Sequence, residues 1–585
     1  MPATPRQPSF ALLLGLAWLA IVVQLLAQHW AETALMLADT DDAMRLAQLR
    51  DWLAGQSWYD LNQARVAGGY ESHWSRLIDA GLAATFWLFG LFAEPAMAER
   101  LMRTAWPMLW LLPTMAGVAA VAWRIADREA ALIALLLAAI GLPAFHQFRP
   151  GRIDHHNVQI ALSLLVLAAT VWSDRVRWAA LAAGAVTGLA MAVGLECLPY
   201  LIACAAAFAL RYLVHPKSAR AAGDYGTALA ASSLAGFLVI VGPDRWSRGV
   251  CDEIAINWLA LTVTGGIGLA LSARIASEQI SVRAMQLLFT GALAVGLFLW
   301  IEPRCLRGPY AAMDPAVWPI WLAHVREMKP LVTLTLESPL TGIAIATFPL
   351  TALIAAFILA RSRDMRADFG FLVATAVFLV SVLMTLAAVK AASYAIWLAM
   401  PLVAVFALHL FDRLKLHALA PRVAVGVLLT PAVLSLGAIT IANAAGLGAG
   451  ESFSRSEPDA CFKSESYAAL SRLPQGVVAA DIDYGPYLLA LTPHTVVAAP
   501  YHRLSAAIMA GQAILASAPD QSQRVAARLG VSYIVTCGRA PPGGLTGEGR
   551  DASLWAKLEA GDIPSWLERI ATSGPPFAAY RIVPR

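Results

Sequence analysis

Long apolar stretches recur along almost the whole chain at spacings typical of membrane-spanning helices. Stretches that reach the roughly 20 residues needed to cross a bilayer begin near residues 10, 77, 104, 129, 157, 178, 196, 225, 253, 284, 340, 368, 391 and 420. The first, from Phe10 to Gln28, follows Arg6 and has no clean small-residue cleavage site after it. We therefore interpret it as an uncleaved first span and not as a signal peptide. The pattern predicts a polytopic α-helical membrane protein.

Short basic connectors between these stretches predict the topology. They contain Arg124 and Arg128, Arg175 and Arg177, Arg211 with Lys217 and Arg220, Arg274 with Arg283, Arg361 with Arg363 and Arg366, and Arg413 with Lys415. The positive-inside rule places all of them in the cytoplasm. Their alternation requires that the stretch 77–96, which carries Asp79 and Glu94, does not span, and we interpret it as an amphipathic helix at the membrane interface. About thirteen spans then remain, with the N-terminus inside.

Under this topology the most unusual polar residues all lie outside the cytoplasm. They belong to the loops 29–99 and 303–339, the loop around 147–156, and the segment 445–585 after the last span. Any one of these loops alone is most simply a solvent-exposed linker. Because four segments with acidic residues or histidine lie on one side, we expect them to form a shared site.

Composition agrees with a chain that lies mostly in lipid. Hydrophobic residues make up 59% and charged residues 14% of the chain, and the mean hydropathy is +0.62, whereas soluble domains are about one quarter charged. The net charge of +4 is small for this length, which argues against nucleic-acid binding. Six scattered cysteines without a CxxC pair indicate neither a zinc site nor a redox motif.

The segment 445–585 has a different pattern, which predicts a small extracytoplasmic α/β domain after a transmembrane domain of residues 1–444. Short apolar runs predict strands and longer periodic runs predict helices, the strands at 476–480, 495–499 and 531–535 and the helices at 505–516 and 521–529. Cys461 and Cys537 also lie in this segment. A disulfide is permitted between them because the compartment outside the cytoplasm is oxidising.

The first outer loop opens with three carboxylates within four residues, Asp39, Asp41 and Asp42. Such charges repel one another unless a cation compensates them. A divalent metal with oxygen ligands is the natural partner. The alternative is a solvated acidic turn at the membrane interface.

The loop around 147–156 combines Asp154, His155 and His156 with two arginines, Arg149 and Arg152. In an extended segment, Asp154 and His156 lie on one side and are able to share a metal ion. The arginines beside them have the geometry to clamp phosphate oxygens. This combination predicts metal or phosphate binding, although a lone histidine would be interpreted as structural.

The remaining ionisable candidates lie at loop 303–339 and at two outer helix ends. Glu327 lies between Arg326 and Lys329, so a simple ion-paired loop is an alternative to a functional glutamate, and Glu337 follows as a second candidate. Glu196 and Lys390 interrupt apolar sequence, and ionisable groups near lipid indicate function by default. The alternative is snorkelling to the interface, which suits Lys390 better than Glu196.

These residues, in this order, resemble the motifs of the catalytic subunit of oligosaccharyltransferase, a C-type glycosyltransferase, and chiefly its single-subunit bacterial and archaeal forms. Asp41 resembles the family's first-loop aspartate, although a shifted register would give Asp39 or Asp42. Asp154-His155-His156 resembles its second-loop motif. The family fold has about thirteen spans, long first and fifth outer loops and a C-terminal outer domain, which agrees with the pattern above.

The fifth-loop motif of the family is matched by the segment from His324 to Pro330, in which His324 departs from the Thr or Ser of the first position. This resemblance favours Glu327 over Glu337. Lys390 resembles the family's arginine near the lipid pyrophosphate. The family's last motif, Trp-Trp-Asp-Tyr-Gly, holds the hydroxyl of an Asn-x-Ser/Thr acceptor. Here Asp483, Tyr484 and the glycine are present, but both tryptophans are absent.

The resemblance implies an inverting glycosyltransferase that moves a sugar from a polyprenyl-(pyro)phosphate donor to an acceptor outside the cytoplasm. The implied roles are metal binding by Asp41, Asp154 and His156 with Mn²⁺ or Mg²⁺, acceptor activation by Asp41 and Glu327, and donor phosphate binding by Arg149, Arg152, His155 and Lys390. Further candidates are Asp39, Asp42, Glu196, Asp483 and Tyr484. The implied location is the inner membrane of a prokaryote, with activity as a single subunit.

Two other functions stay open. The missing tryptophans favour a sister enzyme that passes sugar from a polyprenyl-phosphate donor to a lipid or an envelope polysaccharide, whereas the Asp-His-His loop and Glu327 favour protein glycosylation. A transporter of lipid-linked glycans is the other alternative. The unusual polar residues gather at one face and not at the midplane where transporters bind their substrates, so this alternative is disfavoured.

Overall fold

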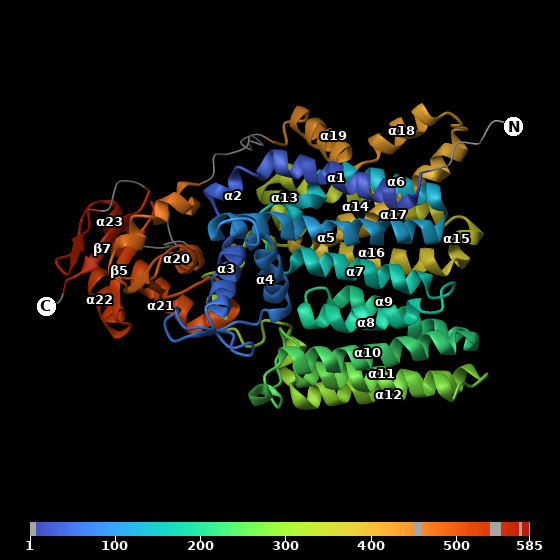
Figure 1. Cartoon of the computed structure of the whole chain (residues 1–585), viewed down its shortest axis with the longest axis horizontal. Coiled ribbons are helices and arrows are strands. Elements are labelled where there is room, and N and C mark those ends of the chain that lie inside the picture. Colours follow the sequence, from blue (N-terminus) through green and yellow to red (C-terminus); the bar gives the residue numbers. More distant parts are fainter. Residues whose placement is uncertain (1–7, 449–458, 539–551, 572–575, 584–585) are drawn as a thin grey trace.

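A computed structural model describes residues 8–448, 459–538, 552–571 and 576–583. Most of the described chain is helical, and the long helices run side by side in one bundle (Figure 1). The bundle contains α1 (Phe10–His29), α5 (Pro95–Ile125), α6 (Arg128–Ala139), α7 (His156–Trp172), α8 (Ala179–Val193), α9 (Leu198–Val214), α10 (Ala219–Ile240), α11 (Ile256–Arg274), α12 (Ile280–Ile301), α14 (Pro339–Leu359), α16 (Phe369–Ala387), α17 (Ala392–Arg413), α18 (Leu419–Leu428) and α19 (Pro431–Ala444).

The apolar helices make the protein an integral membrane protein. Within the described residues, eight helices are long and apolar enough to cross a membrane, and up to ten if each of two bent helix pairs forms one span. The bent pairs are α6 with the 3₁₀ helix η1 (Leu142–Phe148) and α18 with α19. Three more apolar helices, α7, α8 and α9, are shorter. The number of about thirteen spans stays a prediction, which requires that these short helices cross as well.

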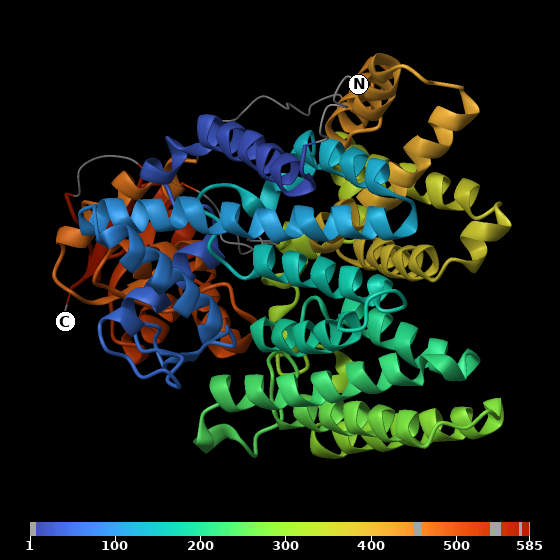
Figure 2. The same ribbon diagram turned by 45° about the vertical axis from the view of Figure 1, so that its right-hand side comes forward.

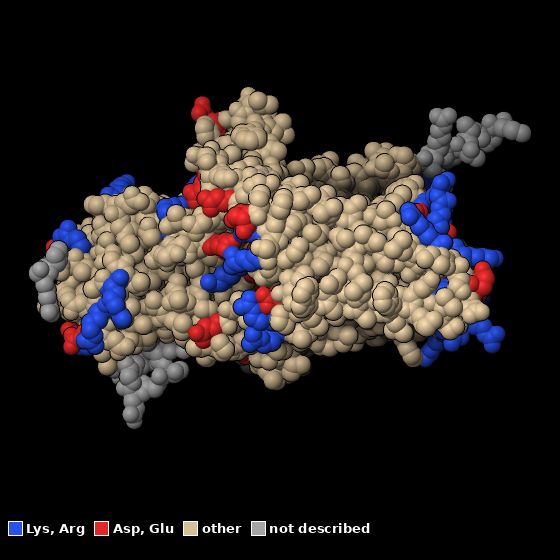
Figure 3. Space-filling view, turned by 90° about the horizontal axis from the view of Figure 1, so that it is seen from below, with Lys and Arg blue, Asp and Glu red and all other residues tan. Residues whose placement is uncertain are grey.

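Charged side chains are distributed unevenly over the surface of the bundle. On the face that Figure 3 shows, lysine, arginine and carboxylate side chains gather at the end far from the C-terminal segment and again near the junction with it. The surface between these two zones is nearly uncharged. Helix α15 (Arg363–Ala367), which lies in a predicted basic connector, is at the far end (Figure 1). A lipid-facing belt between two polar zones accounts for this pattern.

The segment between α1 and α5 forms a compact polar layer on the end of the bundle. It contains α2 (Glu32–Leu35), α3 (Thr40–Leu53), the two-stranded hairpin β1 (Asn62–Gln63) and β2 (Tyr70–Glu71), and α4 (Arg76–Gly90). In Figures 1 and 2 this layer lies between the bundle and the C-terminal segment. The predicted loop 29–99 is therefore largely folded.

Helix α4 covers most of the stretch that was predicted not to span. Its Asp79 is fully buried and accepts hydrogen bonds from Arg45 (3.1 Å) and Arg76 (2.9 Å). A carboxylate paired in this way anchors the first half of α4 in protein and not in lipid. The last turn of α4 exposes Trp87 and Leu88, as an interfacial helix would. The helix is not among the apolar helices that qualify as spans in the described residues.

The C-terminal segment carries a five-stranded sheet in the order β4-β3-β5-β7-β6. Its strands are β3 (Val477–Ala479), β4 (Thr495–Val496), β5 (Val531–Thr536), β6 (Leu567–Arg569) and β7 (Ala578–Ile582). Strand β3 pairs in parallel with β4 and β5, whereas β7 runs antiparallel to both β5 and β6. The helices of this segment are α20 (Gly485–Leu491), α21 (Ser505–Ala516), α22 (Pro519–Arg528) and α23 (Leu554–Glu559). The three predicted strands and two predicted helices are all present, and β6 and β7 were not predicted.

Backbone hydrogen bonds join the C-terminal segment to the first polar layer. The amide of Ala67 donates to the carbonyl of Val496 at 2.8 Å, and the amide of Val496 donates to the carbonyl of Arg65 at 2.8 Å. The hydroxyl of Tyr501 donates to the carbonyl of Thr40 at 3.1 Å. These contacts place the C-terminal segment against the start of α3.

Two disulfides are present in the described residues. Cys461 and Cys537 are bonded, with their Cα atoms 6.1 Å apart, which is the pairing that the predicted topology permits. Cys251 and Cys305 are also bonded, and this pair was not predicted. It ties the connection between α10 and α11 to the connection that follows α12.

Candidate active site

The polar layer, the bundle and the C-terminal segment meet around one cavity of about 620 Å³. Its wall includes aspartate, glutamate, histidine and lysine side chains from nine separate parts of the chain, together with apolar residues of α9. The sequence-predicted residues in this wall are Asp39, Asp41, His155, Glu196, Glu327, Lys390 and Asp483. Segments as far apart as residues 39 and 483 therefore contribute to one site.

Asp39 and Asp42 organise the first turn of α3. Asp39 caps the helix, because its Oδ1 accepts the amides of Asp41 (2.9 Å) and Asp42 (3.1 Å), as acidic N-caps do. The Oδ1 of Asp42 accepts the amides of Ile153 (2.6 Å) and Asp154 (3.0 Å). Asp42 thus holds the loop around 147–156 in place.

Gly151 lets that loop turn back against α3. Its φ of +101° is in the region that favours glycine, and a Cβ atom there would lie 3.3 Å from the Cβ of Ala38. The prediction that Asp154 and His156 share one side of an extended segment is wrong in its geometry, because His156 begins α7. The two residues are neighbours for another reason: Asp154 accepts the His156 amide at 3.0 Å, which caps the exposed N–H groups of the helix start.

Arg152 lies among the carboxylates and not at the cavity wall. Its guanidinium forms ion pairs with Asp39, with Asp42 (3.1 Å) and with Asp154 (2.6 Å), and its side chain is 5% exposed. Burial opposes ionisation of Asp154, but Arg152 and His156 hold the pKa of its carboxyl well below its usual value. The structure therefore does not place Arg152 where the predicted contact with a donor phosphate requires it.

Asp41 is the carboxylate that these partners leave unpaired. In the described part of the chain its side chain makes no hydrogen bond or ion pair, and it faces the cavity. Burial and the nearby carboxylates of Asp154 and Glu327 raise the pKa of Asp41 to about 7, although His156 and Lys390 oppose this shift. A cation bound beside this carboxyl would stabilise its ionised form.

Glu196 links the second loop to Lys390. It accepts from Nδ1 of His156 at 2.9 Å, forms an ion pair with Lys390, and lies 3.9 Å from Nε2 of His155. Burial opposes its ionised form, but Lys390 and the two histidines hold the pKa of Glu196 well below its usual value. Lys390 is therefore paired, and it also lines the cavity.

Glu327 lies in the short 3₁₀ helix η7 (Arg326–Met328) and is exposed to the cavity. The ion-paired alternative does not hold for it among the described residues, because Lys329 pairs with Glu337 at 2.6 Å and Arg326 donates to the hydroxyl of Thr341 at 3.3 Å. The amide of Val389 donates to the carbonyl of Lys329 at 3.0 Å. This bond holds the Glu327 loop beside Lys390.

Of the predicted residues, six are not in the cavity wall: Asp42, Arg149, Arg152, Asp154, His156 and Tyr484. Arg149 contacts Nδ1 of His146 at 3.1 Å and is not in the wall. Tyr484 is 1% exposed and packs against Phe462 and Phe577 in the C-terminal segment, so its place is structural. Its neighbour Asp483 does line the cavity.

The donor atoms near α3 and α7 fall into overlapping groups suited to a metal ion. Asp41, Asp154 and His156 form one group, Asp39, Asp42 and Asp154 a second, and His155, His156 and Glu196 a third, each with ligand atoms within 4.8 Å of one another. Arg152 already neutralises the second group, and Lys390 pairs with Glu196 of the third. The first group is the one that retains an unpaired carboxylate.

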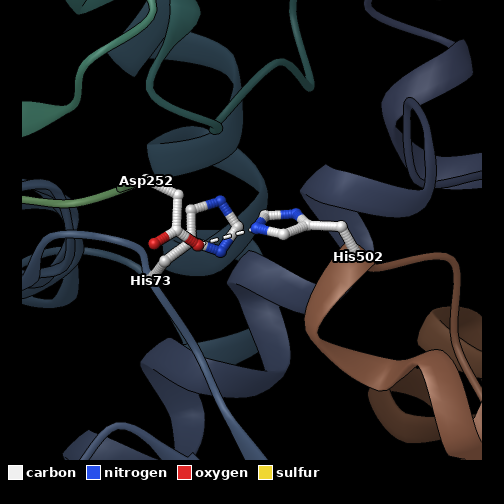
Figure 4. A group of neighbouring side chains, drawn as sticks. All are labelled: His73, Asp252 and His502. Carbon is white, nitrogen blue, oxygen red and sulfur yellow. Dashed lines mark hydrogen bonds and ion pairs between the residues drawn. The ribbon is translucent and has the colours of Figure 1, made fainter. Parts of the chain in front are cut away.

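His73, Asp252 and His502 also line the cavity and were not predicted. Nε2 of His502 and Oδ2 of Asp252 lie 2.7 Å apart, and the rings of His73 and His502 are 4.8 Å apart (Figure 4). Burial is the main cause that lowers the pKa of His73. Each of the three is isolated in the sequence, so no local spacing could indicate the group.

The fold resembles that of archaeal oligosaccharyltransferase. The structure of AglB from Archaeoglobus fulgidus in complex with an inhibitory peptide and a dolichol-phosphate matches with a TM-score of 0.68 and 14% identity, over 95% of this chain and 78% of that one. A second structure of the Archaeoglobus fulgidus enzyme, tethered to an acceptor peptide containing the NVT sequon, has a TM-score of 0.65 and 14% identity, over 98% and 74%.

A third structure of that enzyme, in complex with Zn and sulfate, matches with a TM-score of 0.59 and 15% identity, over 90% of this chain and 68% of that one. No protein-family model matches the sequence, and a search of curated proteins finds no significant match. The likeness is therefore one of fold.

Proposed function

We propose that this protein is a metal-dependent glycosyltransferase that moves a sugar from a polyprenyl-(pyro)phosphate donor to an acceptor outside the cytoplasm. The observation that carries the proposal is the convergence of Asp41, Glu327 and Lys390 on one cavity at the end of a membrane-embedded bundle. A lipid-linked donor would reach such a cavity from the bilayer, and an acceptor would reach it from the aqueous side. The fold shared with AglB, whose structure holds a dolichol-phosphate, supports this assignment.

The residues at the first metal group fit a hard divalent cation. Two carboxylates and one imidazole, from Asp41, Asp154 and His156, are oxygen and nitrogen donors of the kind that Mn²⁺ and Mg²⁺ accept. The unpaired Asp41 carboxyl, with its pKa of about 7, supports the fit because a cation would compensate its charge. When bound there, the ion would supply positive charge against the departing phosphate.

The chain's own residues then account for the other requirements of transfer. Lys390 and His155 in the cavity wall bind the donor phosphate, at which negative charge develops. Asp41 and Glu327 accept hydrogen bonds from the acceptor and orient it for in-line attack. As the new bond forms at the anomeric carbon, the carbon–oxygen bond to phosphate breaks with inversion, the phosphate takes the electron pair, and the acceptor proton passes to a carboxylate.

Protein glycosylation is the first candidate for the acceptor, and a lipid or envelope polysaccharide is the second. The second is favoured by the segment before Tyr484, where Asp481 and Ile482 stand in place of the two tryptophans of the oligosaccharyltransferase motif. Neither residue is aromatic and both are buried, so they cannot hold a peptide hydroxyl as the two tryptophans would. Glu327 facing Asp41 across one cavity favours the first.

The remaining parts of the proposal concern placement. Residues 1–444 form the transmembrane glycosyltransferase domain, and residues 445–585 form an extracytoplasmic domain that closes the cavity from the aqueous side. The protein lies in the inner membrane of a prokaryote, acts as a single subunit, and has its cavity on the periplasmic side. The two disulfides support an oxidising location for this face.

The acceptor is tested by offering purified protein a lipid-linked sugar with Mn²⁺ and separate acceptors. One sample receives an Asn-x-Thr peptide, and the other receives the lipid and polysaccharide fraction of the host envelope. Labelled peptide supports protein glycosylation, and label only in the second sample supports the sister activity. The absence of covalent product from both samples contradicts the proposal.

A further inference from the structure

A second group of metal-ligating side chains lies on the wall of the same cavity. His73 precedes α4, Asp252 lies between α10 and α11, and His502 begins the 3₁₀ helix η13 (His502–Leu504). Each offers one ligand atom, and these atoms all lie within 4.8 Å of one another. Figure 4 shows the two imidazole rings and the carboxylate converging from three separate segments.

His73 has an unused ring nitrogen in this group. Its Nδ1 is buried without a hydrogen-bond partner in the described residues. Buried polar atoms are nearly always paired, so such an atom requires an explanation. A metal ion that uses a ring nitrogen of His73 as a ligand provides one, because neutral imidazole is the commonest metal ligand.

The group is held rigidly. Asp252 follows Cys251, which is bonded to Cys305. Arg503 clamps Asp252 through Nε and Nη2, each at 2.7 Å, and also binds Glu253 at 3.0 Å. A metal site gains affinity when supporting contacts fix its ligands before the ion arrives.

The local charge leaves room for a cation. Asp252 and Glu253 bring two negative charges, and Arg503 brings one positive charge. Glu71, whose carbonyl accepts from Arg503, has its carboxylate paired with Arg245 and Arg248. With neutral histidines, Asp252, Glu253 and Arg503 carry one negative charge between them, and all six charged groups together sum to zero. The surroundings therefore present no net positive charge that would repel a divalent ion.

We propose that His73, Asp252 and His502 form a second, zinc-type metal site, distinct from the group of Asp41, Asp154 and His156. Two imidazole nitrogens and one carboxylate oxygen are a common ligand set for zinc, and a tetrahedral ion keeps a fourth position open. Ligand atoms around such an ion lie about 3.3 Å apart, so the present group needs only small side-chain rotations. The open position faces the cavity, where it takes a water molecule or an oxygen of a bound phosphate or sugar.

The site is tested by zinc binding to the full-length protein, purified with a tag free of histidine and stripped with a chelator. The Asp154→Asn variant removes the first metal group, so zinc that it still binds reports the second. We expect this variant to hold one equivalent of zinc by mass spectrometry and to give the absorption of tetrahedral Co²⁺ when cobalt replaces zinc. Adding His73→Gln or His502→Gln should abolish both signals, whereas adding His215→Gln, at an exposed histidine, should change neither.

Folding is controlled within the same experiment. His502→Gln keeps a donor for Asp252, and zinc should raise the unfolding temperature of the Asp154→Asn variant but not that of the double variants. The proposal is overturned if Asp154→Asn binds no zinc, or if the His73→Gln and His502→Gln double variants bind zinc as tightly as their parent. Neither result bears on sugar transfer, which is measured separately with Mn²⁺ in the unsubstituted protein.

Discussion

The guanidinium of Arg152 lies 2.6 Å from the carboxylate of Asp154, which belongs to the same tight turn. The same guanidinium also pairs with Asp39 and Asp42 of α3. Arg152 thus neutralises the acidic cluster on its buried side, while Asp41 on the cavity side stays unpaired. This division separates the structural carboxylates from the one that is free to act.

Removing that arginine should destabilise the protein. Arg152→Met leaves the buried carboxylates of Asp42 and Asp154 close together without their counter-charge, and breaking a buried ion pair in this way costs about 3 to 5 kcal/mol. We expect a clear drop in the thermal unfolding temperature in detergent. Arg149→Met, three residues earlier in the same loop and outside the cavity wall, should change the stability by less than about 1 kcal/mol. Equal stability of the two variants would contradict this role of Arg152.

Metal binding should depend on the ionisation of Asp41. The folded protein raises its pKa from 3.8 to about 7, so the proton is held below pH 7 and must leave before the carboxylate binds a cation. Without metal, this raised pKa means that the contribution of Asp41 to folding stability falls as the pH rises through 7. Mn²⁺ affinity should therefore weaken by about tenfold or more per pH unit as the pH falls below 7.

That dependence is measured by titrating Mn²⁺ into the purified protein from about pH 5.5 to about pH 8.5. The pKa of Asp41 is affected by four charged neighbours, Asp154, Glu327, His156 and Lys390. The variant Asp41→Asn removes the titrating group and retains these neighbours. The Mn²⁺ affinity of this variant should be weaker, and it should depend much less on pH below pH 7. An affinity in the unsubstituted protein that is flat across pH 7 would rule out Asp41 as a ligand.

Glu327 and Glu337 offer a matched pair of carboxylates in one loop. Glu327 faces the cavity unpaired among the described residues, whereas Glu337 is bound to Lys329. Glu327→Gln should lower the rate of sugar transfer by about 100-fold, as loss of a group that accepts a proton or orients the acceptor does, with unchanged Mn²⁺ affinity. Glu337→Gln should leave the rate within about threefold. The opposite order of effects would show that the motif has been assigned to the wrong glutamate.

The disulfides predict how the six cysteines react. Alkylation of the denatured, unreduced protein should modify only Cys197 and Cys204, which are free. Reduction should then expose Cys251 with Cys305 and Cys461 with Cys537. Mass spectrometry of peptides from protein isolated from intact cells measures this directly. Modification of all six before reduction would place these segments in a reducing compartment.

Much of the architecture was readable because membrane helices and alternating strands leave local patterns. The helix positions and the strands β3, β4 and β5 follow from periodicity within short windows. The non-spanning stretch that contains Asp79 follows from the alternation of the basic connectors along the chain. Strand β6 was missed because Leu567–Arg569 is short and charged, and an edge strand of this kind carries little apolar alternation.

The parts of the site that sequence could not supply depend on partners far along the chain. Arg152 was interpreted as a phosphate ligand because only one of its carboxylate partners, Asp154, is near it in the sequence. Its other partners, Asp39 and Asp42, lie more than a hundred residues earlier. His73, Asp252 and His502 come from three unrelated loops, and a single histidine or aspartate in a loop carries no signal of its own. Their grouping is a product of tertiary packing.

The most direct test of the account is a single-turnover assay with a purified polyprenyl-linked sugar, Mn²⁺ and the host's own acceptors, run on the unsubstituted protein and on Asp154→Asn. The account predicts that the unsubstituted protein forms a covalent sugar–acceptor product together with an equal amount of free polyprenyl phosphate or pyrophosphate. It also predicts that Asp154→Asn, still folded, forms neither. Movement of the intact lipid-linked sugar across a vesicle membrane without either product, or full activity of Asp154→Asn, would contradict it.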